Sequence, residues 1–114
     1  MLARELFEAQ RSALRAKALT YQDRMDALRA LEQALLRHKN DIVRAISEDF
    51  GGRAAEETLA LERIPTLGEI REARKNLKRW MEPRAVPVGW QFQPARARIE
   101  MQPKGVVGIL GAWF

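Results

Sequence analysis

The closing stretch, residues 102–114, constrains the fold most. It reads QPKGVVGILGAWF, and its four aliphatic side chains are interrupted only by glycine: Val106, Val107, Ile109 and Leu110. A short apolar run of this kind is typical of a strand buried on both faces, most often in a parallel sheet. One such strand cannot bury itself, and too few residues follow it for a crossover helix and a second strand. We therefore expect the chain to be the opening piece of a larger protein.

Composition favours one small folded domain without disulfides. The chain has 114 residues and no cysteine, which excludes a disulfide framework, a thiolate metal site and a cysteine nucleophile within it. Its one histidine, His38, excludes a histidine-rich metal site, so we expect no metal ligands. The longest apolar run is about half of the roughly 20 residues that cross a bilayer, and the N-terminus lacks the apolar core of a signal peptide. We therefore expect a cytoplasmic protein with no membrane partner.

The charge balance permits nucleic-acid binding without favouring it. The net charge is +5, but 20 basic residues are set against 15 acidic ones, and the two signs are interspersed over most of the length. A nucleic-acid footprint would instead gather basic residues on one face. We therefore do not expect nucleic acid to be a partner.

Apolar spacing predicts two helices in the first third of the chain. In each, apolar residues recur at intervals of three and four: Leu2, Leu6, Ala9 and Ala13, then Met25, Leu28, Leu31 and Leu35. The first helix should end before Thr20, which forms a capping-box pattern with Asp23, and the second should end near Arg37. His38 then lies where the helix dipole favours a cation. The alternative for His38, a catalytic base or metal ligand, lacks a partner nearby in sequence.

A third helix is predicted to begin after Asn40. Asn40 is a favoured N-cap residue, and the apolar residues that follow share one face: Ile42, Ile46 and Phe50. Gly51 and Gly52 should end this helix, because glycine adopts the left-handed C-cap conformation without steric cost. Two glycines could also begin a phosphate loop, but these lack the Walker spacing and no strand precedes them.

Residues 54–81 are predicted to form a fourth helix that kinks or splits near Ile64. Pro65 is the cause, because proline removes a backbone donor and clashes with the preceding turn. The second half of this helix is strongly basic, with Arg71, Arg74, Lys75, Lys78 and Arg79. A basic helix could enter a DNA groove, but we favour a solvated face on which Glu72 pairs with Lys75.

The residues that follow predict a β extension. Prolines at 83, 87 and 94 indicate an extended connector over 83–96, pinned by Trp90 and Phe92. Alternation of apolar and charged residues over 97–101 then predicts a half-buried edge or interface strand. The expected fold is mainly α, with about four helices, one of them kinked or split near Pro65, and a C-terminal β extension.

A family resemblance is carried by two segments, ISEDFGGRAAEETLALERIPTLGEIREARKNLKRWMEPR and ARARIEMQPKGVVGILGAW. Within the second, PKGVVGILGAW is similar to the pattern P-x-G-V-V-x-x-I-x-x-W-N. That pattern marks the first strand of the NAD-binding sheet in the aldehyde dehydrogenase superfamily. The chain resembles the N-terminal part of that α/β fold, nearest the coniferyl aldehyde dehydrogenase branch. The resemblance implies an N-terminal helical region in residues 1–82. Residues 83–114 would then hold the proline-rich connector, a charged edge strand used in oligomerisation and the first strand of an incomplete NAD-binding domain.

The resemblance also implies site residues. Leu110, Gly111, Ala112 and Trp113 correspond to the stretch that lines the cofactor cleft, and NAD or NADP is the cofactor of the complete enzyme. The next family position is an asparagine whose amide stabilises the oxyanion, and here it is Phe114, which has no side-chain donor. The family's cysteine nucleophile and glutamate base lie further along, and oxidation through a thiohemiacetal requires a thiolate. We expect this chain alone to supply no catalytic residue, bind no dinucleotide and show no dehydrogenase activity.

Three functional hypotheses follow. The first is an N-terminal fragment of an NAD(P)-dependent aldehyde dehydrogenase, which oxidises an aldehyde to a carboxylic acid in the complete enzyme. The second is a stand-alone helical interaction or regulatory module derived from such an enzyme. The third is a basic helical nucleic-acid binder that uses residues 71–79. Under the first, the unpaired edges of residues 106–113 should recruit a second copy or pack against the helices, so we expect self-association through this segment.

Overall fold

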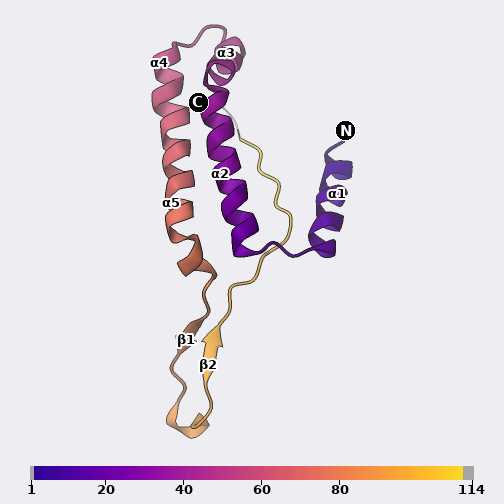
Figure 1. Cartoon of the computed structure of the whole chain (residues 1–114), viewed down its shortest axis with the longest axis vertical. Helices are drawn as coiled ribbons and strands as arrows, with labels where there is room; N and C mark the ends of the chain where they lie inside the picture. The colour runs from indigo at the N-terminus through magenta and orange to yellow at the C-terminus, as the bar shows by residue number, and fades with distance from the viewer. Residues whose placement is uncertain (1, 112–114) are drawn as a thin grey trace. The chain divides into compact units, whose positions relative to one another are not determined.

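The computed structural model describes residues 2–111. The chain separates into two compact units, Met1–Thr20 with Met81–Phe114, and Tyr21–Trp80. Figure 1 shows the elements of both units. None of the helices within residues 2–111 combines the length and hydropathy needed to cross a membrane.

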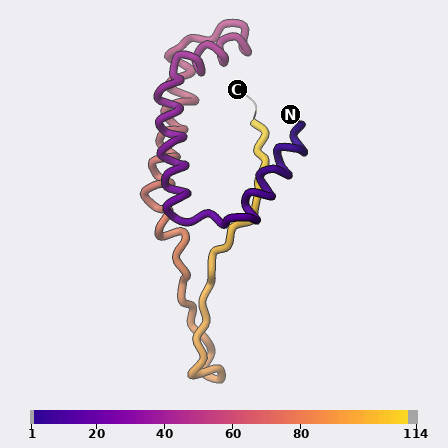
Figure 2. Tube along the Cα trace, turned by 45° about the vertical axis from the view of Figure 1, so that its right-hand side comes forward, coloured from indigo at the N-terminus to yellow at the C-terminus, as the bar shows by residue number. Residues whose placement is uncertain are grey.

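The unit Tyr21–Trp80 is mainly helical. Its elements are α2 (Tyr21–Arg37), α3 (Lys39–Asp49), α4 (Ala55–Thr58), the π-helical turn η1 (Leu59–Arg63) and α5 (Ile64–Met81). α5 runs beside α2 in both views (Figures 1 and 2). The buried apolar residues come from α2, α3 and α5: Met25, Ile46, Leu67 and Ile70. The predicted helices of this region are confirmed, and their core is small.

The start of α3 differs from the prediction. The His38 N–H donates to the Ala34 carbonyl at 2.9 Å, and the Ile42 N–H donates to the His38 carbonyl at 2.9 Å. The hydrogen-bonded turn therefore continues through His38, which is the N-cap residue in place of Asn40. Because Asn40 lies inside the helix, it has no cap to make.

The end of α3 is a glycine stop, as predicted. Gly51 has a φ of 70°, in the left-handed region. Its N–H donates to the Glu48 carbonyl at 3.2 Å, and the Gly52 N–H donates to the Ser47 carbonyl at 2.8 Å. This pair of bonds is a Schellman motif, which satisfies carbonyls that a helix end would otherwise leave free.

Pro65 is accommodated by a π turn. Ile64, the first residue of α5, donates its N–H to the Leu59 carbonyl, five residues back. A proline in a helix lacks an N–H and crowds the carbonyl four residues earlier, and the wider π turn relieves that crowding. The predicted kink or split near Ile64 takes this form.

A buried carboxylate ties α2 to α5. Glu32 is only 7% exposed. It accepts a hydrogen bond from Arg71 Nε at 2.7 Å and another from Arg74 Nη1. The bond from Arg71 lowers the pKa of Glu32 most, burial raises the pKa in part, and Arg74 lowers it further. Two cations therefore keep this carboxylate ionised inside the helical unit.

Arg53 fastens the glycine turn to the helical stretch that follows it. Its side chain is 5% exposed, and its Nη1 donates to Glu62 Oε1 at 3.1 Å. Its Nε lies 3.8 Å from Glu57 Oε2, and its guanidinium carbon lies 4.9 Å from the centroid of the Phe50 ring. One cation thus joins α3, α4 and η1 through two carboxylates and an aromatic face.

The described residues of the other unit form a helix and a hairpin. Their elements are α1 (Ala3–Ala16), β1 (Arg84–Val86), the 3-10 turn η2 (Trp90–Phe92) and β2 (Ala97–Ile99). β1 and β2 pair antiparallel, with Arg84 opposite Ile99 and Val86 opposite Ala97. The predicted helix and the predicted strand are therefore confirmed, although the strand ends two residues before Met101.

The connector prediction for residues 83–96 is wrong in one respect. These residues supply β1 and the loop of the hairpin, and the aromatic rings do not pin them, because Trp90 is 87% exposed and Phe92 is 62% exposed. Backbone bonds shape the loop instead: the Phe92 N–H donates to the Gly89 carbonyl at 2.9 Å, and the Ala95 N–H donates to the Phe92 carbonyl at 2.8 Å.

The strand predicted over residues 106–110 does not form. Residues 100–111 have no regular secondary structure. Val106 is half-buried, whereas Ile109 is 89% exposed and Leu110 is fully exposed. The physical reason is that a strand needs a hydrogen-bonded neighbour, and the structure shows none for this segment within residues 2–111.

Two glycine substitutions should shift stability in opposite directions. Gly51→Ala should cost about 1 kcal/mol, because its φ of 70° disfavours a Cβ. Gly68→Ala should stabilise by about 0.5–1 kcal/mol, because Gly68 lies inside α5 and nothing lies within 4 Å of the added Cβ. The urea midpoint of unfolding measures both, and equal shifts of the same sign would contradict the glycine stop.

Glu32→Gln should lower the urea midpoint at about pH 7, because an amide is a weaker acceptor for two guanidinium groups. The pKa of Glu32 is lowered in the folded state, so its contribution is present above the ordinary carboxyl range. It is lost as the pH falls through the folded-state pKa. The gap between wild type and Glu32→Gln should therefore shrink as the pH falls from about 7 towards about 3.

The matched control for this experiment is Asp26→Asn, also on α2. Asp26 pairs with Arg29 at 3.1 Å on an exposed face, where such pairs contribute little. Its substitution should leave the midpoint nearly unchanged. A gap for Glu32→Gln that did not vary with pH would count against an ionised buried carboxylate.

Candidate functional site

Of the residues expected to meet a cofactor, Leu110 and Gly111 lie at the end of the extended segment, residues 105–111. Leu110 and Gly111 are exposed. Ala112, Trp113 and Phe114, the residue that stands where the family has an asparagine, lie outside the described residues. Gly105 begins the segment with a φ of 108°, a conformation that side chains rarely adopt. The glycine of the Pro-Lys-Gly sequence is therefore used for its backbone freedom.

The described residues around Leu110 form no crevice between strands for a dinucleotide. In an open parallel sheet, a dinucleotide binds in the crevice outside the carboxyl ends of adjacent strands. Residues 100–111 form no strand, so the described part of the chain presents no such crevice at Leu110. The cofactor contacts of residues 110–113 therefore stay a prediction.

The basic second half of α5 is only partly a solvated face. Arg71 and Arg74 bind Glu32 of α2, and Arg79 Nη2 donates to Asn76 Oδ1 at 2.9 Å. Glu72 accepts a bond from Asn76 Nδ2 at 2.6 Å, and no Glu72 to Lys75 ion pair is seen among residues 2–111. The longest stretch of basic residues is thus drawn partly into internal contacts.

The pairing of Glu32 with Arg71 and Arg74 is not predicted from the sequence. The signal is an acidic residue at an apolar position of a helix: Glu32 follows Leu28 by four residues and precedes Leu35 by three. A carboxylate on that stripe requires a cation from another element when it is buried. Two arginines at the spacing of one helical turn, such as Arg71 and Arg74, are the pattern to look for.

The single histidine lies at a helix junction. His38 Nδ1 is 3.2 Å from Asp41 Oδ2, both side chains are well exposed, and Arg44 also binds Asp41. Within residues 2–111, no group of three or more possible metal ligands comes together. The contacts of His38 are therefore those of an exposed side chain beside a neighbouring carboxylate.

Comparison with known proteins places these features in a family. A sequence model of the aldehyde dehydrogenase family matches residues 3–113. A probable coniferyl aldehyde dehydrogenase of Pseudomonas aeruginosa is 41% identical over 109 residues, which are 95% of this chain and 23% of that protein. The coniferyl aldehyde dehydrogenase of a Pseudomonas species is 37% identical over 69% of this chain and 16% of its own length. Aldehyde dehydrogenase family 3 member A2 of Macaca fascicularis is 30% identical over 98% of this chain and 23% of its own length.

The match to the family model extends through the apolar run at the end of the chain. The chain spans about a quarter or less of the length of the curated relatives it matches. The resemblance noted in the sequence, including its coniferyl aldehyde dehydrogenase branch, is confirmed by these matches. Because the family model covers residues 3–113, this chain belongs to the aldehyde dehydrogenase family.

Proposed function

We propose that the chain is the N-terminal portion of an NAD(P)-dependent aldehyde dehydrogenase, which oxidises an aldehyde to a carboxylic acid when complete. The observation that carries the proposal is the family match over residues 3–113 in relatives about four times as long. The exposed apolar residues at 107–110 support it, because a segment of this composition is suited to a sheet interior.

The chemistry explains why the chain would not act alone. Oxidising an aldehyde through a covalent intermediate begins with attack by a thiolate on the carbonyl carbon. The chain has no cysteine, so the nucleophile must come from residues beyond this sequence. The proposed contribution of this portion is structural: the helical unit, the hairpin and one strand of the cofactor-binding sheet.

The first substrate to assay is coniferyl aldehyde, because several of the similar proteins carry that name. NAD and NADP should be compared as oxidants. Both oxidants are tested because the described residues form no dinucleotide crevice by themselves.

A chimera tests the proposal. This chain should replace the matching region of the Pseudomonas aeruginosa relative, with Phe114 at the junction. The chimera carrying Phe114→Asn should reduce NAD with coniferyl aldehyde, and the chimera with Phe114 should be slower in kcat by about 100-fold, because it lacks an oxyanion donor. The absorbance of the reduced dinucleotide measures both rates.

Controls make the chimera decisive. The isolated 114-residue chain should give no turnover, and the intact relative should set the full rate. A well-folded Phe114→Asn chimera without activity would contradict the proposal that this chain supplies the N-terminal portion. Turnover by the isolated chain would contradict its dependence on an outside thiolate.

We also propose that the isolated chain self-associates through residues 106–110. Ile109 and Leu110 are almost fully exposed, and unpaired strand-like segments recruit one another. Ile109→Asp should shift the protein towards monomer in light scattering across a concentration range, because a charge cannot enter an apolar strand pairing. The matched control is Leu61→Asp, at an exposed leucine of η1, which should leave the mass unchanged. A wild-type monomer at all concentrations would exclude this association.

A further inference from the structure

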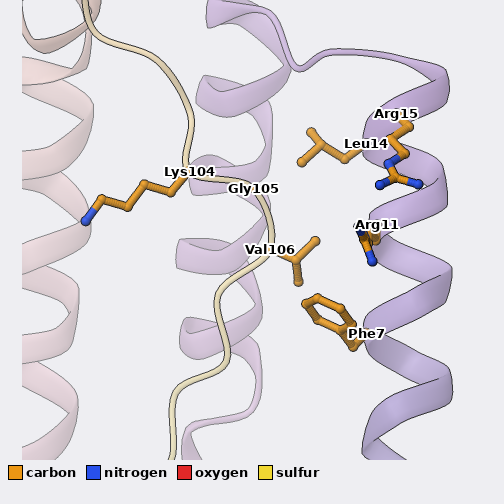
Figure 3. Close-up of a pocket in the computed structure, with 7 residues that line it drawn as sticks. All are labelled: Phe7, Arg11, Leu14, Arg15, Lys104, Gly105 and Val106. Carbon is orange, nitrogen blue, oxygen red and sulfur yellow. The ribbon is translucent and has the colours of Figure 1, made fainter.

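A cavity of about 460 Å³ lies against α1, within the unit that contains both chain ends. Its wall is formed by one face of α1 and by the turn that begins the extended segment (Figure 3): Phe7, Arg11, Leu14, Arg15, Lys104, Gly105 and Val106. This volume falls in the range of roughly 300–1,000 Å³ that is typical of small-molecule pockets.

One part of this wall is apolar. Figure 3 shows the Val106 side chain pointing towards the Phe7 ring and Leu14. Leu14 and Val106 are half-buried, whereas Phe7 is still 41% exposed. Phe7 and Leu14 are separated by two helical turns on the same face, so together they offer a continuous apolar surface to a flat or extended body.

The other part of the wall is cationic. Arg11 and Arg15 are one helical turn apart and lie on the same face of α1 as the apolar residues (Figure 3). Among the described residues, no aspartate or glutamate lines the cavity, and Arg11 lies 3.8 Å from Glu8, a long separation for an ion pair. Lys104 points away from the arginines, so its charge does not face them.

We propose that this cavity binds an amphipathic carboxylate, with a flat or extended apolar body and one carboxylate group. The guanidinium of Arg11 or Arg15 would pair with the carboxylate, for which its planar donors are well matched. The apolar body would cover Phe7, Leu14 and Val106. An inorganic anion would meet the charge alone and leave the apolar surface in water.

The proposal concerns this chain by itself, because Val106 of the cavity wall belongs to the segment that is proposed to enter a sheet in the complete enzyme. The probe is cinnamate, titrated into the full 114-residue chain at low salt and followed by NMR. The Arg11 and Arg15 Nε–H signals and the Leu14 and Val106 methyl signals should shift together and saturate, with a Kd on the order of 1 mM. Cinnamyl alcohol, which keeps the body and lacks the charge, should bind about tenfold more weakly.

Paired variants separate this cavity from general charge attraction. Arg15→Gln should weaken cinnamate about fivefold, while preserving the helix propensity of α1. Arg4→Gln is the matched control, because Arg4 lies on the same helix outside the cavity wall, and it should leave Kd unchanged. Leu14→Ala should weaken cinnamate and the alcohol alike, since both use the apolar wall.

Several results would overturn the proposal. Phosphate that binds as tightly as cinnamate would show attraction of charge alone, and alcohol that binds as tightly would show an apolar patch alone. Equal losses for Arg4→Gln and Arg15→Gln would show that the cavity is not involved. Shifts that fail to saturate would show that no site exists.

Discussion

A strand is stable only when its backbone donors and acceptors meet those of a neighbour, and this constraint governs the C-terminal third of the chain. Residues 84–86 and 97–99 satisfy it by pairing with each other. Within residues 2–111, the segment 100–111 has no such neighbour, so Val107, Ile109 and Leu110 stay largely in water. The matched residues are 23% of one relative, which agrees with the proposal that the partner strands belong to further sequence.

The helical unit Tyr21–Trp80 is held together by a few buried apolar residues and by ion pairs. Its buried apolar residues are few, and two ionic ties supplement them: Glu32 with two arginines, and Arg53 with two glutamates and an aromatic ring. A buried carboxylate is costly to leave unpaired but well tolerated when its partners are in place. The first tie joins α2 to α5, and the second joins the end of α3 to α4 and η1.

The local features of the fold could be predicted from the sequence. Apolar spacing located the helices, Gly51 marked the end of α3, and Pro65 marked the irregular turn. Long-range contacts could not be predicted, because Glu32 and Arg71 are 39 positions apart and nothing local pairs them. The apolar run at 106–110 predicts a buried strand, but the described residues contain no strand that pairs with it. The proposed cofactor contacts depend on such a strand, so only their family placement follows from the sequence.

The π turn at Leu59–Arg63 has a consequence for how this helix tolerates change. Such a turn holds one residue more than a regular helical path would need. Removing one residue there would restore a continuous α-helix and leave the segments on either side facing nearly the same way, because the bulge already absorbs the extra residue. The Pro65 ring would then crowd the carbonyl four residues earlier, as it does in a regular helix. The extra residue therefore gives that ring its room without changing which sides of the flanking segments face inward.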